Sequence, residues 1–427
     1  MAGPVISSTS TVRFAAQTDA TTSLLAIVNL VRKGEATTKP DIGRVTGLGR
    51  GVVTQRVEQA ITLGYLEEAD FGPSSGGRAP RTLRFRAERG RILVCAMGAL
   101  HLRVGVTDLD GRILARSHRV WDIASGPDAT TAMAMRMFDD ILDADARSRI
   151  WGVGVGVPGP VEFESGRPVA PPIMPGWNGF DVRRPFIERF GAPVWVDNDV
   201  NLLALSERSR RRESGQDDLI YFKVGSGIGV GLLSKGHLHR GANGAAGDIG
   251  HVRIHDAGRL CRCGKTGCLE ASAGGWALVR DALEAVERGE SQALAAVRER
   301  TGEITPVDIS IAAQNGDAVS IGLVQRSARL VGESLATLVN VFNPAVIVVG
   351  GAISASGEIF LAEVRQRVYE LSLPLATRDL VLVRSINDED DPIRGGAELV
   401  REQLFEIHFG RWFAEGQPSL SALETVN

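Results

Sequence analysis

HVRIHDAGRLCRCGKTGCLE, residues 251–270, begins with a histidine and holds three of the four cysteines of the chain within eight positions. Thiolates and a neutral imidazole are ligands that zinc prefers, and a tetrahedral site needs four of them. Gly264 and Gly267 allow so short a loop to turn back on itself. Four protein ligands leave no open coordination position, so the spacing predicts a structural Zn²⁺. The candidate ligands are His251, Cys261, Cys263 and Cys268.

A disulfide loop, or thiols buried side by side by coincidence, is the alternative interpretation of this stretch. Clustered Cys and His in a cytosolic chain favour a metal. Cys95 is left out of the site, because it lies far away in the sequence on an expected buried strand.

Five further stretches extend the pattern on both sides of the cysteine loop. They are GVGVGVPGPVE (152–162), PGWNGFDV (175–182), VDNDVNLLALSE (196–207), VGSGIGVGLLSKGHLHRGANGAAGDIGH (224–251) and NVFNPAVIVVGGAIS (340–354). Together with CxCGxxGCxE they resemble the ROK family of repressors and sugar kinases, over roughly residues 90 to 410. The resemblance implies an α/β body with two lobes of the actin and hexokinase type.

This resemblance also divides the chain. We expect a tail at 1–20, a winged helix-turn-helix at 21–88, a ROK sugar-binding body at 91–410 with its cleft near residue 199, and a tail at 411–427. The stretches 92–114 and 219–241 both alternate strands with glycine turns, which indicates two duplicated lobes.

The resemblance implies a sugar-binding side of the cleft with intact polar groups. Sugar recognition needs amides and carboxylates that converge on neighbouring hydroxyls. Asp199 matches the general base of ROK kinases, and His251 would serve both the metal and the sugar. One methylene is lost where the family has GEIGH and this chain has GDIGH (247–251). The implied sugar-binding residues are Asn178, Asn198, Asp199, Asp248, His251 and Glu270.

The phosphate side departs from the family pattern. ROK kinases carry an Asp-x-Gly-x-Thr loop, whereas this chain has Ala96-Met97-Gly98-Ala99-Leu100. Loss of the carboxylate removes charge compensation on which phosphoryl transfer depends. The glycine run 225–229 and the pair at 350–351 remain. We therefore expect no active kinase, with Asp199 as the base if the chain were one.

The first 90 residues predict a DNA-binding module. Apolar residues at helical spacing predict a helix from Thr22 to Gly34, a short helix after Pro40, and a third helix that ends at Gly64. Two strands, 65–68 and 82–86, would flank a wing with Arg78 near its tip. The expected DNA-contacting residues are Arg50, Thr54, Gln55, Arg56 and Arg78, since Arg and Gln read base edges and wing arginines suit phosphates.

Charge and composition agree with one basic module on an acidic body. The net charge is −3, yet residues 1–90 hold 12 Lys and Arg against 8 Asp and Glu. No signal peptide is apparent at the amino terminus, and the apolar run 336–353 is broken by polar residues and predicts a helix end followed by a strand. We expect a cytoplasmic chain without a membrane span.

The sequence therefore predicts a sugar-responsive transcription regulator of carbohydrate metabolism. Its expected partners are an operator duplex, a small sugar or amino sugar, and further copies of itself in a homodimer or homotetramer. An ATP-dependent sugar kinase of the hexokinase or glucokinase type that carries a DNA-binding domain is the alternative.

Overall fold

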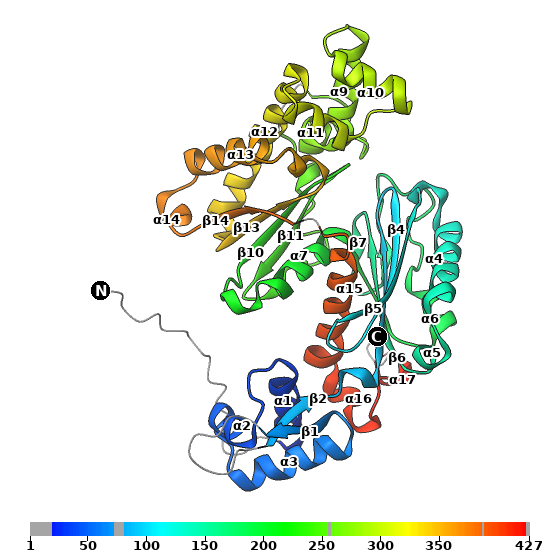
Figure 1. Ribbon diagram of the computed structural model, residues 1–427, viewed down its shortest axis with the longest axis vertical. Coiled ribbons are helices and arrows are strands. Elements are labelled where there is room, and N and C mark those ends of the chain that lie inside the picture. Colours follow the sequence, from blue (N-terminus) through cyan, green and yellow to red (C-terminus); the bar gives the residue numbers. More distant parts are fainter. Residues whose placement is uncertain (1–18, 72–80, 255–257, 387, 424–427) are drawn as a thin grey trace.

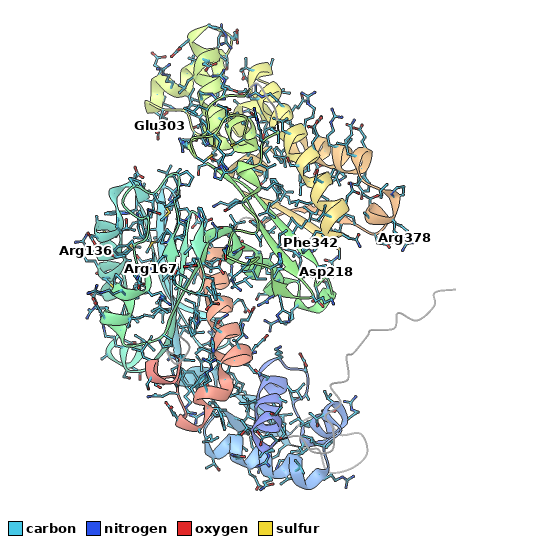
Figure 2. All side chains as sticks on the ribbon, turned by 180° about the vertical axis from the view of Figure 1, so that it is seen from behind. Arg136, Arg167, Asp218, Glu303, Phe342 and Arg378 are labelled. Atoms are coloured by element: carbon cyan, nitrogen blue, oxygen red, sulfur yellow. The ribbon has the colours of Figure 1, made fainter. Side chains whose placement is uncertain are left out.

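The computed structural model describes residues 19–71, 81–254, 258–386 and 388–423. Three parts follow one another along the long axis in Figure 1: a small domain of helices and two strands, a first lobe, and a second lobe. Seen from behind in Figure 2, Arg136 and Arg167 mark the first lobe, while Asp218 and Phe342 mark the second.

The small amino-terminal domain has three helices and one antiparallel strand pair. These are α1 (Ala20–Arg32), α2 (Lys39–Thr46), α3 (Arg50–Thr62), β1 (Leu66–Phe71) and β2 (Arg81–Phe85). Thr38 caps α2 by accepting the N–H of Asp41, and Gly47 ends α2 in the left-handed conformation at φ 73°. The three predicted helices and both strands are thus confirmed.

The first lobe contains a five-stranded sheet in the order β5-β4-β3-β6-β9. Alternating glycines on β6 leave room for a helix on one face, since a Cβ at Gly154 would lie 2.6 Å from the carbonyl oxygen of Gly396. Helix α4 covers the other face, where Met137 and Phe138 are fully buried. The elements are β3 (Arg91–Met97), β4 (His101–Thr107), β5 (Ile113–Val120), α4 (Pro127–Ile141), α5 (Ala144–Ser148), β6 (Ile150–Val157), β7 (Val161–Glu162), β8 (Arg167–Pro168), α6 (Arg183–Phe190) and β9 (Val194–Asn198).

The second lobe repeats this topology in the order β12-β11-β10-β13-β14. In both sheets three antiparallel strands are followed by two parallel ones, so the predicted duplication of lobes is confirmed. The strands are β10 (Leu219–Val224), β11 (Ile228–Ser234), β12 (His237–Leu238), β13 (Val346–Gly350) and β14 (Val381–Arg384). The helices are α8 (Leu269–Ala273), α9 (Gly275–Glu287), α10 (Gln292–Thr301), α11 (Pro306–Gln314), α12 (Ala318–Phe342), α13 (Glu358–Leu371) and α14 (Pro374–Thr377).

Two helices join the lobes. Helix α7 (Asp199–Arg210) packs on β10 and β11 of the second sheet, and α15 (Asp391–Glu402) packs on β3 and β6 of the first. The two helices also pack on each other, and α15 descends toward the amino-terminal domain in Figure 1.

The end of the chain differs from the predicted tail at 411–427. A π-helical turn (Gln403–Ile407) continues α15 and is followed by α16 (Phe409–Trp412) and α17 (Leu420–Leu423). Trp412 is fully buried in an aromatic cluster, with ring centroids 4.9 Å from Phe409 and 6.2 Å from Tyr65. The apolar indole and benzyl groups at the chain's end therefore join the core that the amino-terminal domain shares with the first lobe.

The helix end and buried strand predicted across 336–353 are present as the end of α12 and as β13. Among the described residues, none of the helices is long and apolar enough to cross a membrane.

Candidate functional site

The cysteine loop brings its four predicted ligands together. One ligand atom from each of His251, Cys261, Cys263 and Cys268 lies within 4.8 Å of the other three. The Sγ atoms of Cys263 and Cys268 are 3.7 Å apart, as are Cys261 Sγ and His251 Nδ1. A disulfide requires sulfurs about 2.05 Å apart, so all four cysteines are free thiols here. The cluster is compatible with a structural metal site, and Cys95 is buried elsewhere on β3.

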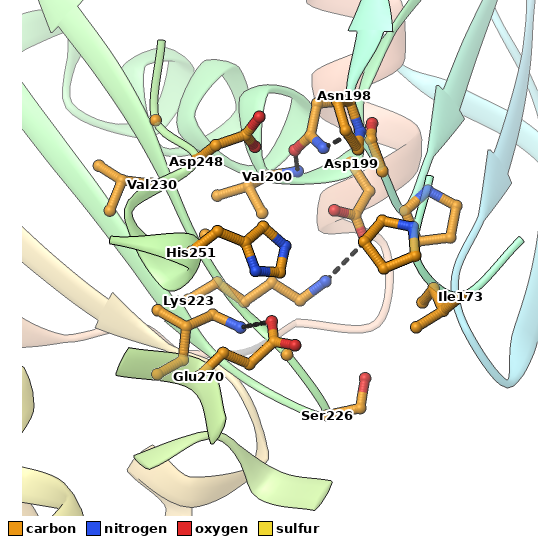
Figure 3. A pocket seen from close by; sticks show the side chains of 18 of the residues that line it. Ile173, Asn198, Asp199, Val200, Lys223, Ser226, Val230, Asp248, His251 and Glu270 are labelled. Carbon is orange, nitrogen blue, oxygen red and sulfur yellow. Dashed lines mark hydrogen bonds and ion pairs between the residues drawn. The ribbon is translucent and has the colours of Figure 1, made fainter. Parts of the chain in front are cut away.

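A pocket lies beside this cluster, between the two lobes. The first lobe contributes the turn at 158–160 and the amino end of α7, and the second contributes the glycine turn at 226–229 and residues 244–251. Of the six predicted sugar-binding residues, five line the pocket: Asn198, Asp199, Asp248, His251 and Glu270. Figure 3 shows their side chains converging from the two sides.

Asn178 is placed differently from the prediction. Its side chain is exposed and absent from the pocket lining, and its Oδ1 accepts the N–H of Ala170 at 2.8 Å. The amide oxygen therefore holds a loop in which Ala170 has a positive φ of 44°. Pro172 and Ile173 of the same loop line the pocket instead.

Asn198 and Asp199 stand at the amino end of α7. Asn198 caps the helix by accepting the N–H of Val200 at 2.9 Å and donates to the carbonyl of Gly159 at 3.0 Å. Asp199 forms an ion pair with Lys223, whose Nζ lies 2.6 Å from Asp199 Oδ2. The would-be general base is thus engaged by an ammonium group inside the pocket (Figure 3).

The His/Cys cluster and the pocket share residues. His251 is both a candidate metal ligand and a residue that lines the pocket. Glu270 lies two residues after Cys268, in the first turn of α8. Glu270 Oε2 accepts the N–H of Ile228 at 3.0 Å, and its Oε1 accepts from Trp276 Nε1 at 3.1 Å. Burial raises the pKa of the neighbouring Asp248 carboxyl. The loop therefore fixes polar groups at the pocket edge, as an orienting shell does around a metal.

The predicted phosphate loop has no carboxylate. Ala96, the last but one residue of β3, is 6% exposed, Ala99 lines the pocket, and Leu100 is 57% exposed. The second glycine run keeps its close packing: a Cβ at Gly227 would lie 2.6 Å from Glu270 Oε2.

Helix α3 presents some of the predicted DNA-contacting residues. Arg50 and Gln55 are exposed, and Thr54 is half-buried. Arg56 is turned toward α1, since its Nε donates to Ser23 Oγ at 3.3 Å and its NH1 to Gln59 at 3.2 Å. Arg78 lies outside the described residues.

Three residues were missed by the sequence analysis. Lys223 and Arg262 line the pocket, and Val52 is 40% exposed on the first turn of α3. Strand β10 (LIYFKV) is apolar apart from Lys223, and a lone charge in a buried strand is a signal for a functional lysine. Nothing in the sequence distinguishes Val52 from its buried neighbour Val53.

Comparisons with known proteins match this architecture. The ROK family model matches residues 93–403. The xylose repressor of Caldicellulosiruptor bescii is 29% identical over 82% of this chain and 87% of that protein. The DNA-binding transcriptional dual regulator NagC of Escherichia coli is 26% identical over 89% of this chain and 92% of that protein. The glucokinase of Halalkalibacterium halodurans is 31% identical over 66% of this chain and 88% of that protein.

Solved structures give the same result for the fold. A ROK family transcriptional regulator described as a homolog of the E. coli MLC protein superposes with a TM-score of 0.78, at 24% identity, over 93% of this chain and 98% of that one. A ROK family glucokinase from Streptomyces griseus, in complex with glucose and AMPPNP, superposes with a TM-score of 0.63 over 73% of this chain and 99% of that one, at 28% identity. The matched family model spans both lobes, the pocket and the cysteine loop, and the chain belongs to the ROK family.

Proposed function

We propose that this chain is a transcription regulator of carbohydrate metabolism that binds an operator through residues 21–88 and a sugar in the pocket between its lobes. The observation that carries the proposal is the union of two features in one chain. The first is helix α3, on which Arg50 and Gln55 are exposed, in a domain that shares a hydrophobic core with the first lobe. The second is a phosphate loop that lacks a carboxylate. Relatives named as a xylose repressor and as a DNA-binding transcriptional dual regulator, each aligned over more than four fifths of the chain, support it.

The amino-terminal domain acts in this proposal as a winged helix-turn-helix with α3 in the major groove. A recognition helix of this class places its first residues against base edges. Two copies in a homodimer, or two pairs in a homotetramer, would present paired helices to a palindromic operator.

Selection from randomised duplexes by the full chain tests this role, with a variant that lacks residues 1–88 as control. We expect a repeated half-site for the full chain and no enrichment for the truncated one. Equal enrichment by both proteins would contradict the proposal.

The pocket acts as a sugar receptor, with Zn²⁺ in the cysteine loop as a structural support. Zinc–sulfur bonds of about 2.3 Å in a tetrahedron separate two sulfurs by roughly 3.8 Å, close to the 3.7 Å between Cys263 and Cys268. The donor set and this spacing both fit zinc. When bound, the ion would hold His251 and the start of α8 in place.

An ATP-dependent sugar kinase is the second candidate, supported by the retained Asp199 and by relatives named glucokinase. Against it stand Ala96 in the phosphate loop and the ammonium of Lys223 on the carboxylate of Asp199. A coupled assay with common hexoses and N-acetylhexosamines at saturating magnesium-ATP separates the two. We expect no turnover, and a rate on the order of 1 s⁻¹ or faster would establish the kinase instead.

A further inference from the structure

Two histidines meet at the edge of the first sheet, apart from the pocket between the lobes. His101 begins β4, and His118 lies on β5, the edge strand of that sheet. The strand register pairs Arg103 with His118, so the two histidines lie on the same face of the strand pair. Both side chains are exposed, and neither belongs to the residues that line the pocket. Neither DNA binding nor sugar binding, as proposed above, uses this pair.

The two imidazole rings are arranged as a chelating pair. His118 Nε2 lies 3.1 Å from His101 Nδ1, and the ring centroids are 5.1 Å apart. Two imidazole nitrogens that bind one ion at about 2.0–2.1 Å are separated by about 2.9 Å at a right angle and by about 3.3 Å in a tetrahedron. The observed separation lies between these two values. Small rotations of the two exposed rings therefore bring both nitrogens onto one ion without a change in the strand register.

Glu389 offers a carboxylate that no other group holds. It stands in the segment that connects β14 of the second lobe to α15. Its neighbours Asp388 and Asp390 are each held by arginines. Glu389 is exposed, and its side chain forms no ion pair or hydrogen bond with the residues that the structure describes. Its carboxylate is thus free to bind a cation.

The charges of Arg103 and Glu389 both act on the two rings. Burial lowers the pKa of both imidazoles, Arg103 lowers it further, and the charge of Glu389 opposes this change. The rings are consequently neutral for the most part at neutral pH, which is the form in which imidazole binds metal ions. Glu389 would attract a cation bound between the rings, whereas Arg103 would repel it.

We propose that His101 and His118 form a second metal site, which binds a divalent transition-metal ion and takes Glu389 as its third ligand. Imidazole nitrogen suits Zn²⁺, Ni²⁺ and Cu²⁺, whereas Mg²⁺ and Ca²⁺ prefer oxygen ligands. Glu389 reaches the ion by a change of its exposed side-chain rotamer, and water fills the remaining positions. The histidines belong to the first lobe and Glu389 to the segment that crosses between the lobes. The bound ion therefore ties this crossing segment to β4 and β5.

Calorimetric titration of the full chain with Ni²⁺ tests the site, in protein whose cysteine loop is already filled with zinc. We expect one Ni²⁺ per chain in addition to the zinc, and elemental analysis of the titrated protein counts both metals. His101→Gln and His118→Gln should each weaken Ni²⁺ binding by about ten-fold or more, since even the loss of a group that supports a ligand costs this much. His237→Gln, at an exposed histidine of β12, is the matched control and should bind Ni²⁺ as the wild type does.

Two charge variants separate a metal site from a structural role of the same residues. Glu389→Gln should weaken Ni²⁺ binding because a carboxylate ligand is lost. Arg103→Gln should strengthen it because the opposing guanidinium is removed, whereas local damage to the fold would weaken binding in both variants. Ni²⁺ should also raise the melting temperature of the wild type and of neither histidine variant.

The outcomes that overturn the proposal are distinct from these. If the wild type binds no Ni²⁺ beyond the zinc, or if either histidine variant binds Ni²⁺ as tightly as the wild type, the second metal site does not exist. If the histidine variants lose Ni²⁺ but Glu389→Gln binds it unchanged, the third ligand and the tie to the crossing segment are refuted.

Discussion

Single side chains explain why the cysteine loop was predictable and the pocket only in part. Four soft ligands within twenty residues have few other uses, so His251 and the three cysteines could be found from spacing alone. The partner of Asp199 could not, because Lys223 is brought to it by strand β10 from a different lobe. Asn178 was expected in the pocket for a different reason, the family resemblance, which does not reveal that its amide oxygen accepts the N–H of Ala170 in a loop and that it does not line the pocket.

Zinc content is the first expected result at this scale. Elemental analysis of protein purified without chelator should find one zinc per chain. Cys263→Ala should lose it and lower the melting temperature, because metal binding contributes to the stability of the loop. Cys95→Ala is the matched control and should keep the metal, since Cys95 is buried on β3. Stoichiometric zinc in the Cys263 variant would contradict the assigned ligand set.

The exposed arginine of α3 and the arginine that is hydrogen-bonded within the domain should behave differently toward DNA. Arg50 is exposed, whereas Arg56 is held by Ser23 and Gln59. Arg50→Ala should cost about 1–3 kcal/mol of operator affinity and relax the preference at one base pair. Arg56→Ala should leave base preference intact in a competition assay. Relaxed preference in the Arg56 variant alone would show that Arg56 leaves Ser23 on binding.

At the scale of elements, close helix packing depends on the paired glycines of α15. A Cβ on Gly395 would lie 1.8 Å from the backbone oxygen of Leu202 in α7, and one on Gly396 would lie 2.3 Å from Val94 in β3. The apolar patterns predicted the strands and the first three helices. They could not predict that two helices distant in sequence meet between the sheets, since that contact is set by small residues rather than by periodicity.

A pair of glycine substitutions tests this packing. Gly395→Ala should destabilise the fold by about 1–3 kcal/mol, the usual cost of overpacking, because backbone atoms of α7 cannot move aside. Gly322→Ala, at an exposed position of α12 with open space around it, should instead stabilise by up to about 1 kcal/mol. Chemical denaturation of both variants measures the difference. Equal stabilities would mean that α7 and α15 are not packed as described.

At the scale of the whole molecule, a continuous route of helices and ion pairs joins the pocket to the amino-terminal domain. Helix α7 starts at Asp199 in the pocket, and near its other end Arg208 NH1 lies 2.8 Å from Glu402 of α15. The π-helical turn that follows α15 carries Glu406, which pairs with Arg32 of α1 at 3.2 Å. Burial lowers the pKa of Arg32 to about 10, so it stays protonated and keeps this ion pair at neutral pH.

Ligand binding in the pocket should therefore change the affinity for DNA. A ligand that touches both lobes favours the arrangement to which it binds more tightly, and α7 and α15 each pack on the sheet of one lobe and on each other. We expect the sugar that binds the pocket most tightly to change operator affinity by about 5- to 150-fold, the usual range of coupling, as measured by fluorescence anisotropy of a labelled operator. Asp199→Asn should retain DNA binding while its response to the ligand shrinks, since the carboxylate that pairs with Lys223 is lost. An unchanged operator affinity with saturating ligand would refute coupling between the two sites.

The junction at Glu406 gives the sharpest test of the route itself. Glu406 contacts neither the pocket nor the exposed face of α3, yet it pairs with Arg32 and with Lys33, whose Nζ lies 3.0 Å away. Glu406→Gln should leave the separate affinities for ligand and for DNA within a factor of about three while it reduces the ratio of operator affinities with and without ligand. Glu358→Gln, on the exposed side of α13, is the matched control and should leave that ratio unchanged. If the Glu406 variant kept the full ratio, coupling would pass through the shared aromatic core around Phe405 and Trp412 rather than through this ion pair.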